Sequence, residues 1–176
     1  MKQIFTVRIQ KVLLVISLLF SVTGCDQLSK FAAREVIPAH GDIWLLPNHI
    51  LVTLTQNTGA FLSLGANWPE QLRTLVFTVA VSLVLLGLTY LIFRRHLSFA
   101  TTIALSFLLA GGLGNLIDRL YLGSVTDFLF VQLGSFSTGI FNIADMVILL
   151  GVSILTLENI RLGKQKKATS RGLSVH

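Results

Sequence analysis

Two long runs without a charged residue constrain this chain more than any other feature. Residues 74–93 form a run of 20 uncharged positions, and residues 97–117 form a run of 21. A helix needs about 20 apolar residues to cross the hydrocarbon core of a bilayer. Each run therefore predicts a membrane-spanning helix.

Two shorter runs lie on either side of this pair. Residues 12–25 give 14 uncharged positions before Asp26, and residues 146–157 give 12 after Asp145. Each reaches spanning length only if its helix carries an aspartate into or beside the membrane. The composition supports this interpretation, because 53% of the chain is hydrophobic and 12% is charged, whereas soluble domains carry about 25% charged residues. We expect four spans, at roughly residues 10–30, 73–93, 97–118 and 140–160.

The segment between the first two spans, residues 31–72, is too long for a tight connection. It contains all three prolines, both tryptophans and an alternating stretch at residues 49–55. Tryptophan is favoured at the membrane–water interface, so we expect a small β-element there. The predicted fold is a mostly α membrane protein with four transmembrane helices and a small interfacial β-element between helices 1 and 2. We expect a single membrane-embedded domain through residue 163 and a disordered basic tail at residues 164–176.

The basic residues are divided unequally between the two sides of the predicted membrane. With four spans both termini share a side, and that side carries ten of the 14 Lys and Arg residues. The positive-inside rule then places both termini in the cytoplasm. The clustering of these residues at the ends of apolar runs argues against a nucleic-acid-binding surface. Seven of the eight acidic residues lie on the outer side, which indicates a functional site near that face.

The first run also resembles a lipoprotein signal sequence. Val22-Thr23-Gly24-Cys25 fits a lipobox and follows a basic and then an apolar stretch. In that reading Cys25 is lipidated and the leader is removed. We favour a first transmembrane helix that happens to contain Gly-Cys, because three more hydrophobic spans follow where a lipoprotein presents a soluble domain.

Polar and acidic residues gather at the outer ends of the spans, and such residues in membrane segments usually mark function. Asp127 and Asp145 each follow a turn-prone stretch and adjoin apolar residues. Two carboxyl groups brought together at low dielectric share a proton, because both cannot ionise easily. One can then deprotonate a water molecule while the other donates to a carbonyl oxygen.

Two functions fit these residues: a hydrolase with an aspartate dyad, and a proton- or ion-coupled transporter that uses the same aspartates as a relay. Other chemistries have less support. No serine lies in a Gly-x-Ser-x-Gly elbow, no histidine neighbours Cys25 in sequence, and the four histidines lack metal-ligand spacing. The adjacent Asp118 and Arg119 suggest an ion pair, with structural support and substrate binding both open as its role.

Five motifs together resemble the lipoprotein signal peptidase (signal peptidase II) family over most of the chain. They are Asp26-Gln27-Leu28-Ser29-Lys30, Asn57-Thr58-Gly59-Ala60-Phe61, Gly112-Leu113-Gly114-Asn115-Leu116-Ile117-Asp118-Arg119, Val125-Thr126-Asp127-Phe128 and Phe141-Asn142-Ile143-Ala144-Asp145. Their order and spacing across four spans make the resemblance specific. One departure is that the family usually places one more residue between the Gly and the Phe of the second motif.

The resemblance implies a bacterial aspartic endopeptidase with Asp127 and Asp145 as its catalytic dyad. It implies that the enzyme cleaves prolipoproteins before a diacylglyceryl-modified cysteine, at the periplasmic face of the inner membrane, without a metal or cofactor. It also implies that globomycin-type peptides block the dyad, and that membrane lipids surround the protein. The residues that it implies for the substrate site are Asp26, Lys30, Asn57, Gly59, Asn115, Asp118, Arg119, Asn142 and Ala144.

Overall fold

The computed structural model describes residues 2–37, 41–60 and 63–173, with side chains from residue 9 to residue 165 within those ranges. Its helices are α1 (Lys2–Val36), α2 (Glu70–Arg73), α3 (Val81–Arg94), α4 (Phe99–Leu122) and α5 (Ile143–Leu173), and a π-helical segment, η2 (Thr74–Ala80), joins α2 to α3. Its strands are β1 (Ile43–Leu46), β2 (Ile50–Asn57), β3 (Val125–Leu133) and β4 (Phe136–Ser137). Phe61 of the second motif lies outside the described residues.

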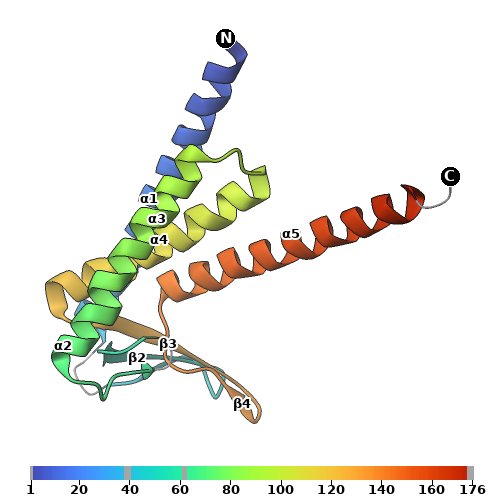
Figure 1. Cartoon of the computed structure of the whole chain (residues 1–176). Coiled ribbons are helices and arrows are strands. Elements are labelled where there is room, and N and C mark those ends of the chain that lie inside the picture. Colours follow the sequence, from blue (N-terminus) through green and yellow to red (C-terminus); the bar gives the residue numbers. More distant parts are fainter. Residues whose placement is uncertain (1, 38–40, 61–62, 174–176) are drawn as a thin grey trace.

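Within the described ranges, four helical segments are long and apolar enough to cross a membrane. They are Ile9–Val36, Glu70–Arg94, Phe99–Leu122 and Ile143–Gln165. The prediction of four spans is therefore confirmed. Figure 1 shows these helices fanning out from the sheet, with both chain ends at the far ends of α1 and α5.

The first and last helices differ in length from their predicted spans. α1 continues past Asp26 to Val36, because Asp26 and Lys30 face protein rather than lipid. α5 runs to Leu173, where the sequence predicted a disordered tail from residue 164. Lys, Gln and Ala are good helix formers, and no proline interrupts them.

Helix α4 is the centre of the bundle. It packs against α5, α1 and α3. Of the residues in its most apolar 18-residue stretch 56% are buried, against 11–17% in the other spans. Ser98 begins the helix by accepting a hydrogen bond from the backbone N–H of Thr101 at 3.1 Å. Gly123 ends it in the left-handed conformation, with φ 72°.

Glycines set the spacing between α4 and its neighbours. A Cβ atom at Gly111 would lie 2.6 Å from the carbonyl oxygen of Ala144 in α5. A Cβ atom at Gly114 would lie 2.5 Å from Oδ2 of Asp26 in α1. The prediction that these glycines permit close helix approach is confirmed.

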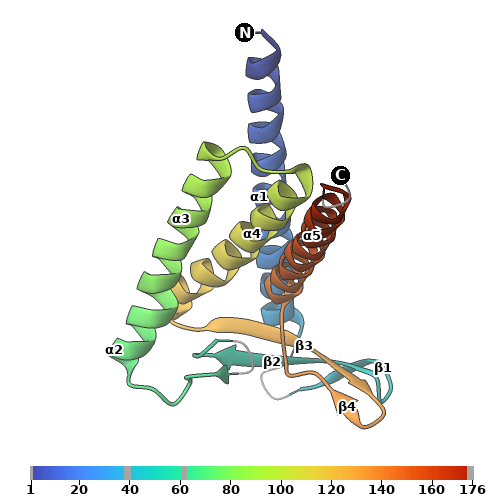
Figure 2. The ribbon, with the colours of Figure 1, turned by 45° about the vertical axis from the view of Figure 1, so that its right-hand side comes forward.

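The four strands form one antiparallel layer in the order β1-β2-β3-β4, which lies across the ends of the helices that are far from the chain termini (Figure 2). The predicted strand at residues 49–55 corresponds to β2. The sequence missed β3 and β4, between α4 and α5, so half of the sheet comes from outside the expected segment. β3 pairs Thr55 with Asp127 and Asn57 with Val125. A register shift between Val52 and Thr55 is a bulge of the kind common near active sites.

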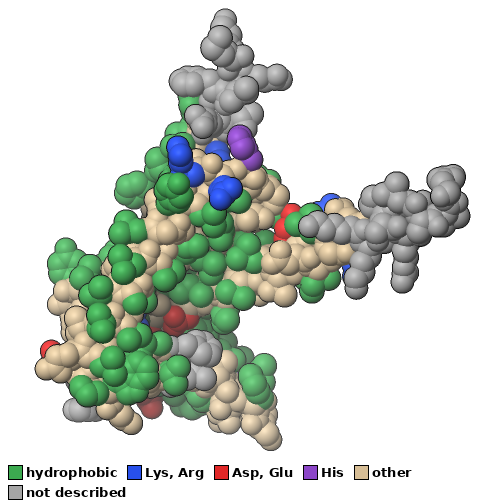
Figure 3. Space-filling model, in the orientation of Figure 1, with side chains coloured by type: hydrophobic (Ala, Val, Ile, Leu, Met, Phe, Trp, Pro, Cys, Tyr) green, Lys and Arg blue, Asp and Glu red, His purple; other side chains and the backbone are tan. Residues whose placement is uncertain are grey.

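The surface matches this arrangement. Hydrophobic side chains cover much of the helices in Figure 3, and acidic side chains are visible in the hollow between the helices and the sheet. Basic side chains gather at the opposite end of the bundle. There Arg94 and Arg95 are exposed and Lys11 donates to the carbonyl oxygen of Arg95 at 3.1 Å.

A glycine-to-alanine pair tests the packing of α4 on α5. We expect Gly111→Ala to lower the thermal unfolding temperature of the detergent-purified protein, since overpacking costs typically 1–3 kcal/mol, as an order of magnitude. Gly87→Ala is the matched control, because nothing lies within 4 Å of a Cβ atom at Gly87. Equal unfolding temperatures for the two variants would contradict the close approach.

Candidate active site

Asp145 lies in the first turn of α5 and takes part in capping that helix. The backbone N–H of Asp145 donates to Oδ1 of Asn142 at 3.0 Å, and the backbone N–H of Asn142 donates to Oδ2 of Asp145 at 3.3 Å. This reciprocal pair has the form of a capping box. The positive end of the helix dipole also favours a carboxylate there. Asp145 is thereby fixed at the point where the chain enters the helix bundle from the sheet.

Asp127 lies on β3 and is 2% exposed. Its two carboxyl oxygens accept from different asparagines: Oδ2 from Asn57 at 2.9 Å, and Oδ1 from Asn142 at 2.6 Å. Asn57 is itself oriented by the backbone, because its Oδ1 accepts from the N–H of Gly59 at 3.0 Å and its Nδ2 also donates to the carbonyl of Ala60. Asn142 therefore contacts both aspartates. Its amide nitrogen donates to Asp127, and its backbone N–H and amide oxygen form the reciprocal capping pair with Asp145.

A third asparagine, Asn115 of α4, completes the set of donors. Its Nδ2 donates to Oδ1 of Asp145 at 2.9 Å, and its Oδ1 accepts from Nζ of Lys30 at 2.9 Å and from Asn142 at 3.2 Å. In all three asparagines an N–H donor occupies the amide oxygen. The amide nitrogens must therefore face the aspartates, which makes the surroundings of the two carboxyl groups rich in donors.

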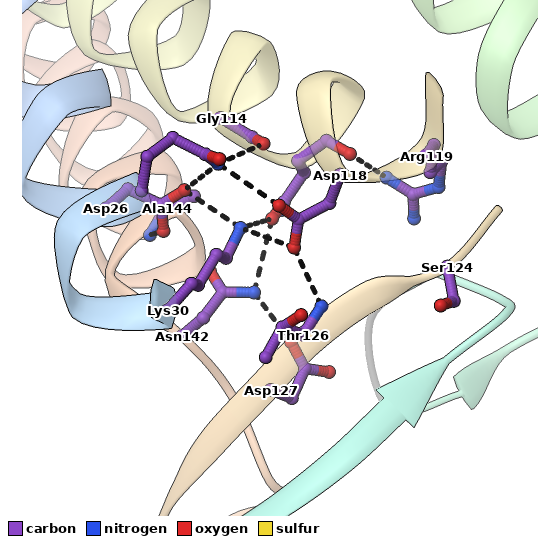
Figure 4. Close-up of polar contacts among 12 residues, drawn as sticks. Asp26, Lys30, Gly114, Asp118, Arg119, Ser124, Thr126, Asp127, Asn142 and Ala144 are labelled. Atoms are coloured by element: carbon purple, nitrogen blue, oxygen red, sulfur yellow. Dashed lines mark hydrogen bonds and ion pairs between the residues drawn. The ribbon is translucent and has the colours of Figure 1, made fainter. Parts of the chain in front are cut away.

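Lys30 is the centre of a buried cluster of charges that includes Asp26 and Asp118 (Figure 4). Its Nζ lies 2.8 Å from Oδ2 of Asp26 and 3.4 Å from Oδ2 of Asp118, and the three residues are 0–2% exposed. Oδ1 of Asp26 accepts from the N–H of Ala144 at 2.9 Å, and Oδ2 of Asp118 accepts from the N–H of Thr126 at 2.8 Å. The cluster thus joins α1, α4, α5 and β3.

Sequence reasoning missed one member of this cluster, Gln27. Its Nε2 lies within hydrogen-bond distance of Oδ2 of Asp26, the carbonyl of Gly114 and Oδ1 of Asp118, at 3.2, 3.0 and 3.2 Å. Gln27 lies between the aspartate and the lysine of the first motif. The one feature of the sequence that could have revealed its role is that it is a polar residue within a predicted transmembrane helix.

Asp118 and Arg119 do not form the ion pair that their adjacency suggested. Successive residues on a helix point about 100° apart. Asp118 therefore faces Lys30, whereas Arg119 faces Gly59 and Phe77. Nη2 of Arg119 donates to the carbonyl of Gly59 at 2.6 Å, and its guanidinium lies 5.6 Å from the ring centre of Phe77. The Nε atom of Arg119 is buried without a hydrogen-bond partner.

Both aspartates line one cavity of about 320 Å³. Of the expected substrate-site residues, Asn57, Asn115 and Arg119 also line it. The remaining six are absent from its described lining. Lys30, Gly59 and Asn142 bond directly to lining residues, whereas Asp26, Asp118 and Ala144 belong to the charge cluster around Lys30. The deeper wall is apolar and was not singled out from the sequence, because Phe77, Val81, Ile148 and Leu149 look like any other residues of a span.

A second cavity, of about 430 Å³, adjoins the first at Asp145 and Leu149. Its other walls include Phe136, Phe141 and Met146, from the β3–β4 region and the start of α5. Asp145 therefore lies between two largely apolar cavities, of which the first also carries the polar groups of Asn57, Asn115, Arg119 and Asp127.

The pKa of Asp127 is raised to about 6, chiefly by burial and also by the nearby charge of Asp145, against the opposing effect of the hydrogen bonds from Asn57 and Asn142. A carboxyl group with such a pKa exchanges a proton readily near neutral pH. Two carboxyl groups that share donors and a cavity can polarise a carbonyl group and activate water. Among the described residues no cluster of three His, Cys, Asp or Glu side chains could hold a metal ion.

The hydrogen bond from Asn57 can be tested by titration. Because this bond stabilises the charged form of Asp127, Asn57→Leu should raise the Asp127 pKa above about 6. Carboxyl ¹³C shifts of the labelled protein in micelles would measure it. Gln132→Leu, on the same strand and away from the cavity, should leave the titration unchanged. A downward shift in Asn57→Leu would contradict the assignment.

Comparison with known proteins identifies the family of this chain. The family model for signal peptidase (SPase) II matches residues 18–161. The lipoprotein signal peptidase of Syntrophus aciditrophicus is 36% identical over 143 residues, which cover 80% of this chain and 88% of that protein. The lipoprotein signal peptidase of Syntrophotalea carbinolica is 32% identical over 158 residues, which cover 90% of this chain and 96% of that protein.

Two solved structures described as bacterial membrane enzymes have the same fold. One has a TM-score of 0.77 and 25% identity, and covers 86% of this chain and 90% of its own. The other has a TM-score of 0.72 and 26% identity, and covers 82% of this chain and 90% of its own. The expected resemblance is confirmed, and this chain belongs to the signal peptidase II family of aspartic-type membrane proteases.

Proposed function

We propose that this protein removes the signal peptide from prolipoproteins by cleaving before a diacylglyceryl-modified cysteine, with Asp127 and Asp145 as the catalytic dyad. The observation that carries the proposal is that both aspartates line one cavity and both contact Asn142. The family is one of proteases, so we set aside the transporter alternative.

In this mechanism one carboxylate removes a proton from water as the water attacks the scissile carbonyl carbon. The other carboxyl group donates its proton to the carbonyl oxygen, and the resulting diol collapses with protonation of the leaving amine. The amide nitrogens of Asn57, Asn115 and Asn142 hold the carboxyl groups in position throughout. No covalent intermediate with the protein forms.

The walls of the two cavities suit a substrate embedded in the membrane. Val81, Ile148 and Leu149 offer an apolar surface to the end of the signal peptide, and the apolar cavity beside Asp145 offers room for acyl chains. Globomycin-type peptides would occupy the cavity that contains the dyad.

The dyad predicts that Asp127→Asn and Asp145→Asn each abolish cleavage of a diacylated prolipoprotein, with losses of about 10³-fold or more. One carboxyl group cannot both accept and donate the proton. Purified protein in detergent with a diacylated substrate measures this loss. Asp42→Asn, at an exposed aspartate before β1, is the matched control and should keep full activity. Near-normal cleavage by either dyad variant would end the assignment.

We also propose a location in the bacterial inner membrane, with both termini cytoplasmic and the dyad near the periplasmic face. The support is the excess of Lys and Arg on the side of the termini and the position of the sheet at the opposite end of the helices (Figure 1).

Reporter fusions would check the orientation. A fusion within the loop between α3 and α4, at Arg95, should report the cytoplasm, because that loop carries basic residues. A fusion near Trp44 should report the periplasm. A cytoplasmic signal at Trp44 would reverse the proposed orientation.

A further inference from the structure

A third cavity, of about 280 Å³, adjoins the dyad cavity and is here called the outer cavity. The two cavities share Phe77 and Arg119 in their lining. The outer cavity is otherwise lined mainly by polar and charged side chains from the start of the second span and from the loop after β2, among them Thr58, Glu70, Arg73 and Thr74.

The two cavities follow one another along the helices, toward the end that carries the sheet. In the second span, Val81 of α3 lines the dyad cavity, whereas Thr74 of η2 and Arg73 of α2 line the outer cavity. On α4, Gly112 lines the dyad cavity and Leu120 the outer one. α3 and α4 run in opposite directions. Along both helices the dyad cavity therefore lies deeper in the bundle and the outer cavity lies nearer the sheet.

The charge of the outer cavity is positive. Among its described lining residues, Arg73 and Arg119 are basic and Glu70 is the one acid. Within the described residues neither arginine makes an ion pair with a carboxylate; Arg73 donates to the carbonyl of Ala66 at 3.3 Å. A guanidinium group is shaped to bind a carboxylate through two parallel hydrogen bonds. The outer cavity is therefore suited to an acidic side chain.

The lining segment itself has an unusual conformation. η2 is π-helical over seven residues, and such segments occur frequently at functional sites. Phe77 of η2 stacks on Trp68 with ring centres 5.7 Å apart, and its ring lies under Arg119. Phe77 and Arg119 thus form the boundary between the two cavities.

We propose that the outer cavity binds the first residues of the mature polypeptide after the modified cysteine, and that Arg73 makes it favour acidic side chains there. The inference rests on the proposed function, in which the signal peptide lies in the membrane and the mature chain leaves toward water. Val81 and Arg73 are eight residues apart, which is at most about 12 Å at the rise of an α-helix. An extended chain covers that distance in roughly three or four residues, so the second to fourth mature residues reach Arg73.

The test compares three diacylated substrates that differ only at the second to fourth mature residues, which are Asp, Ser or Lys. For the wild type we expect kcat/KM to be about 3–5-fold higher for the Asp substrate than for the Lys substrate, the upper part of the range for partly exposed charge pairs. The preference should fade in about 0.5 M salt, where the Debye length is roughly 4 Å. Arg73→Gln should remove the preference, and Arg73→Glu should reverse it.

Arg95→Glu is the matched control, because Arg95 is exposed at the opposite end of the span; it should keep the wild-type preference. A structural role for Arg73 would instead lower cleavage of all three substrates by the same factor. That result, or an unchanged preference in Arg73→Glu, would overturn the inference while leaving the proposed function intact. If the wild type cleaves none of the three substrates, the proposed function fails and the inference fails with it.

Discussion

The buried ammonium group of Lys30 is the interaction on which the rest of the structure depends. A charge without water must be compensated nearby, and removing one partner of a buried ion pair typically costs about 3–5 kcal/mol. Asp26 and Asp118 supply that compensation from α1 and α4. Backbone N–H groups also donate to both carboxylates, from Ala144 of α5 to Oδ1 of Asp26 and from Thr126 of β3 to Oδ2 of Asp118. The carboxylates that neutralise Lys30 therefore also hold the start of α5, through Ala144, and the start of β3, through Thr126.

The same cation also sets the orientation of a side chain beside the dyad. Lys30 offers only donors, so the oxygen of Asn115 turns toward it and the amide nitrogen turns toward Asp145. The backbone imposes the same orientation on Asn57 and Asn142. The two aspartates are thus held by neutral donors, while the full positive charge stays one residue away. This arrangement leaves the carboxyl groups free to exchange a proton, whereas a direct ion pair with lysine would favour permanent ionisation of the partner.

The sequence was sufficient for the spans and for singling out the two aspartates that line one cavity, but not for the pairing of distant residues. Uncharged runs reveal spans because the bilayer imposes length and composition on each helix separately. Asp127 and Asp145 stood out as acids beside apolar residues. β3 was missed because its first four residues are all buried, which removes the alternation that marks a half-exposed strand. Adjacency of Asp118 and Arg119 was misleading because helix geometry, not sequence distance, decides which side chains meet.

The continuity of α1 has a consequence for how such an enzyme coexists with its own substrates. Val22-Thr23-Gly24-Cys25 lies within a helix that runs from Lys2 to Val36, and Oγ1 of Thr23 donates to the carbonyl of Ala110 in α4 at 3.1 Å. Within a helix each carbonyl oxygen is occupied by an N–H group one turn ahead, so a water molecule and a proton donor cannot approach the Gly24–Cys25 bond from opposite sides. Under the proposed cleavage before a cysteine, the helical fold of this segment would protect it from the enzyme, although its sequence resembles that of a substrate.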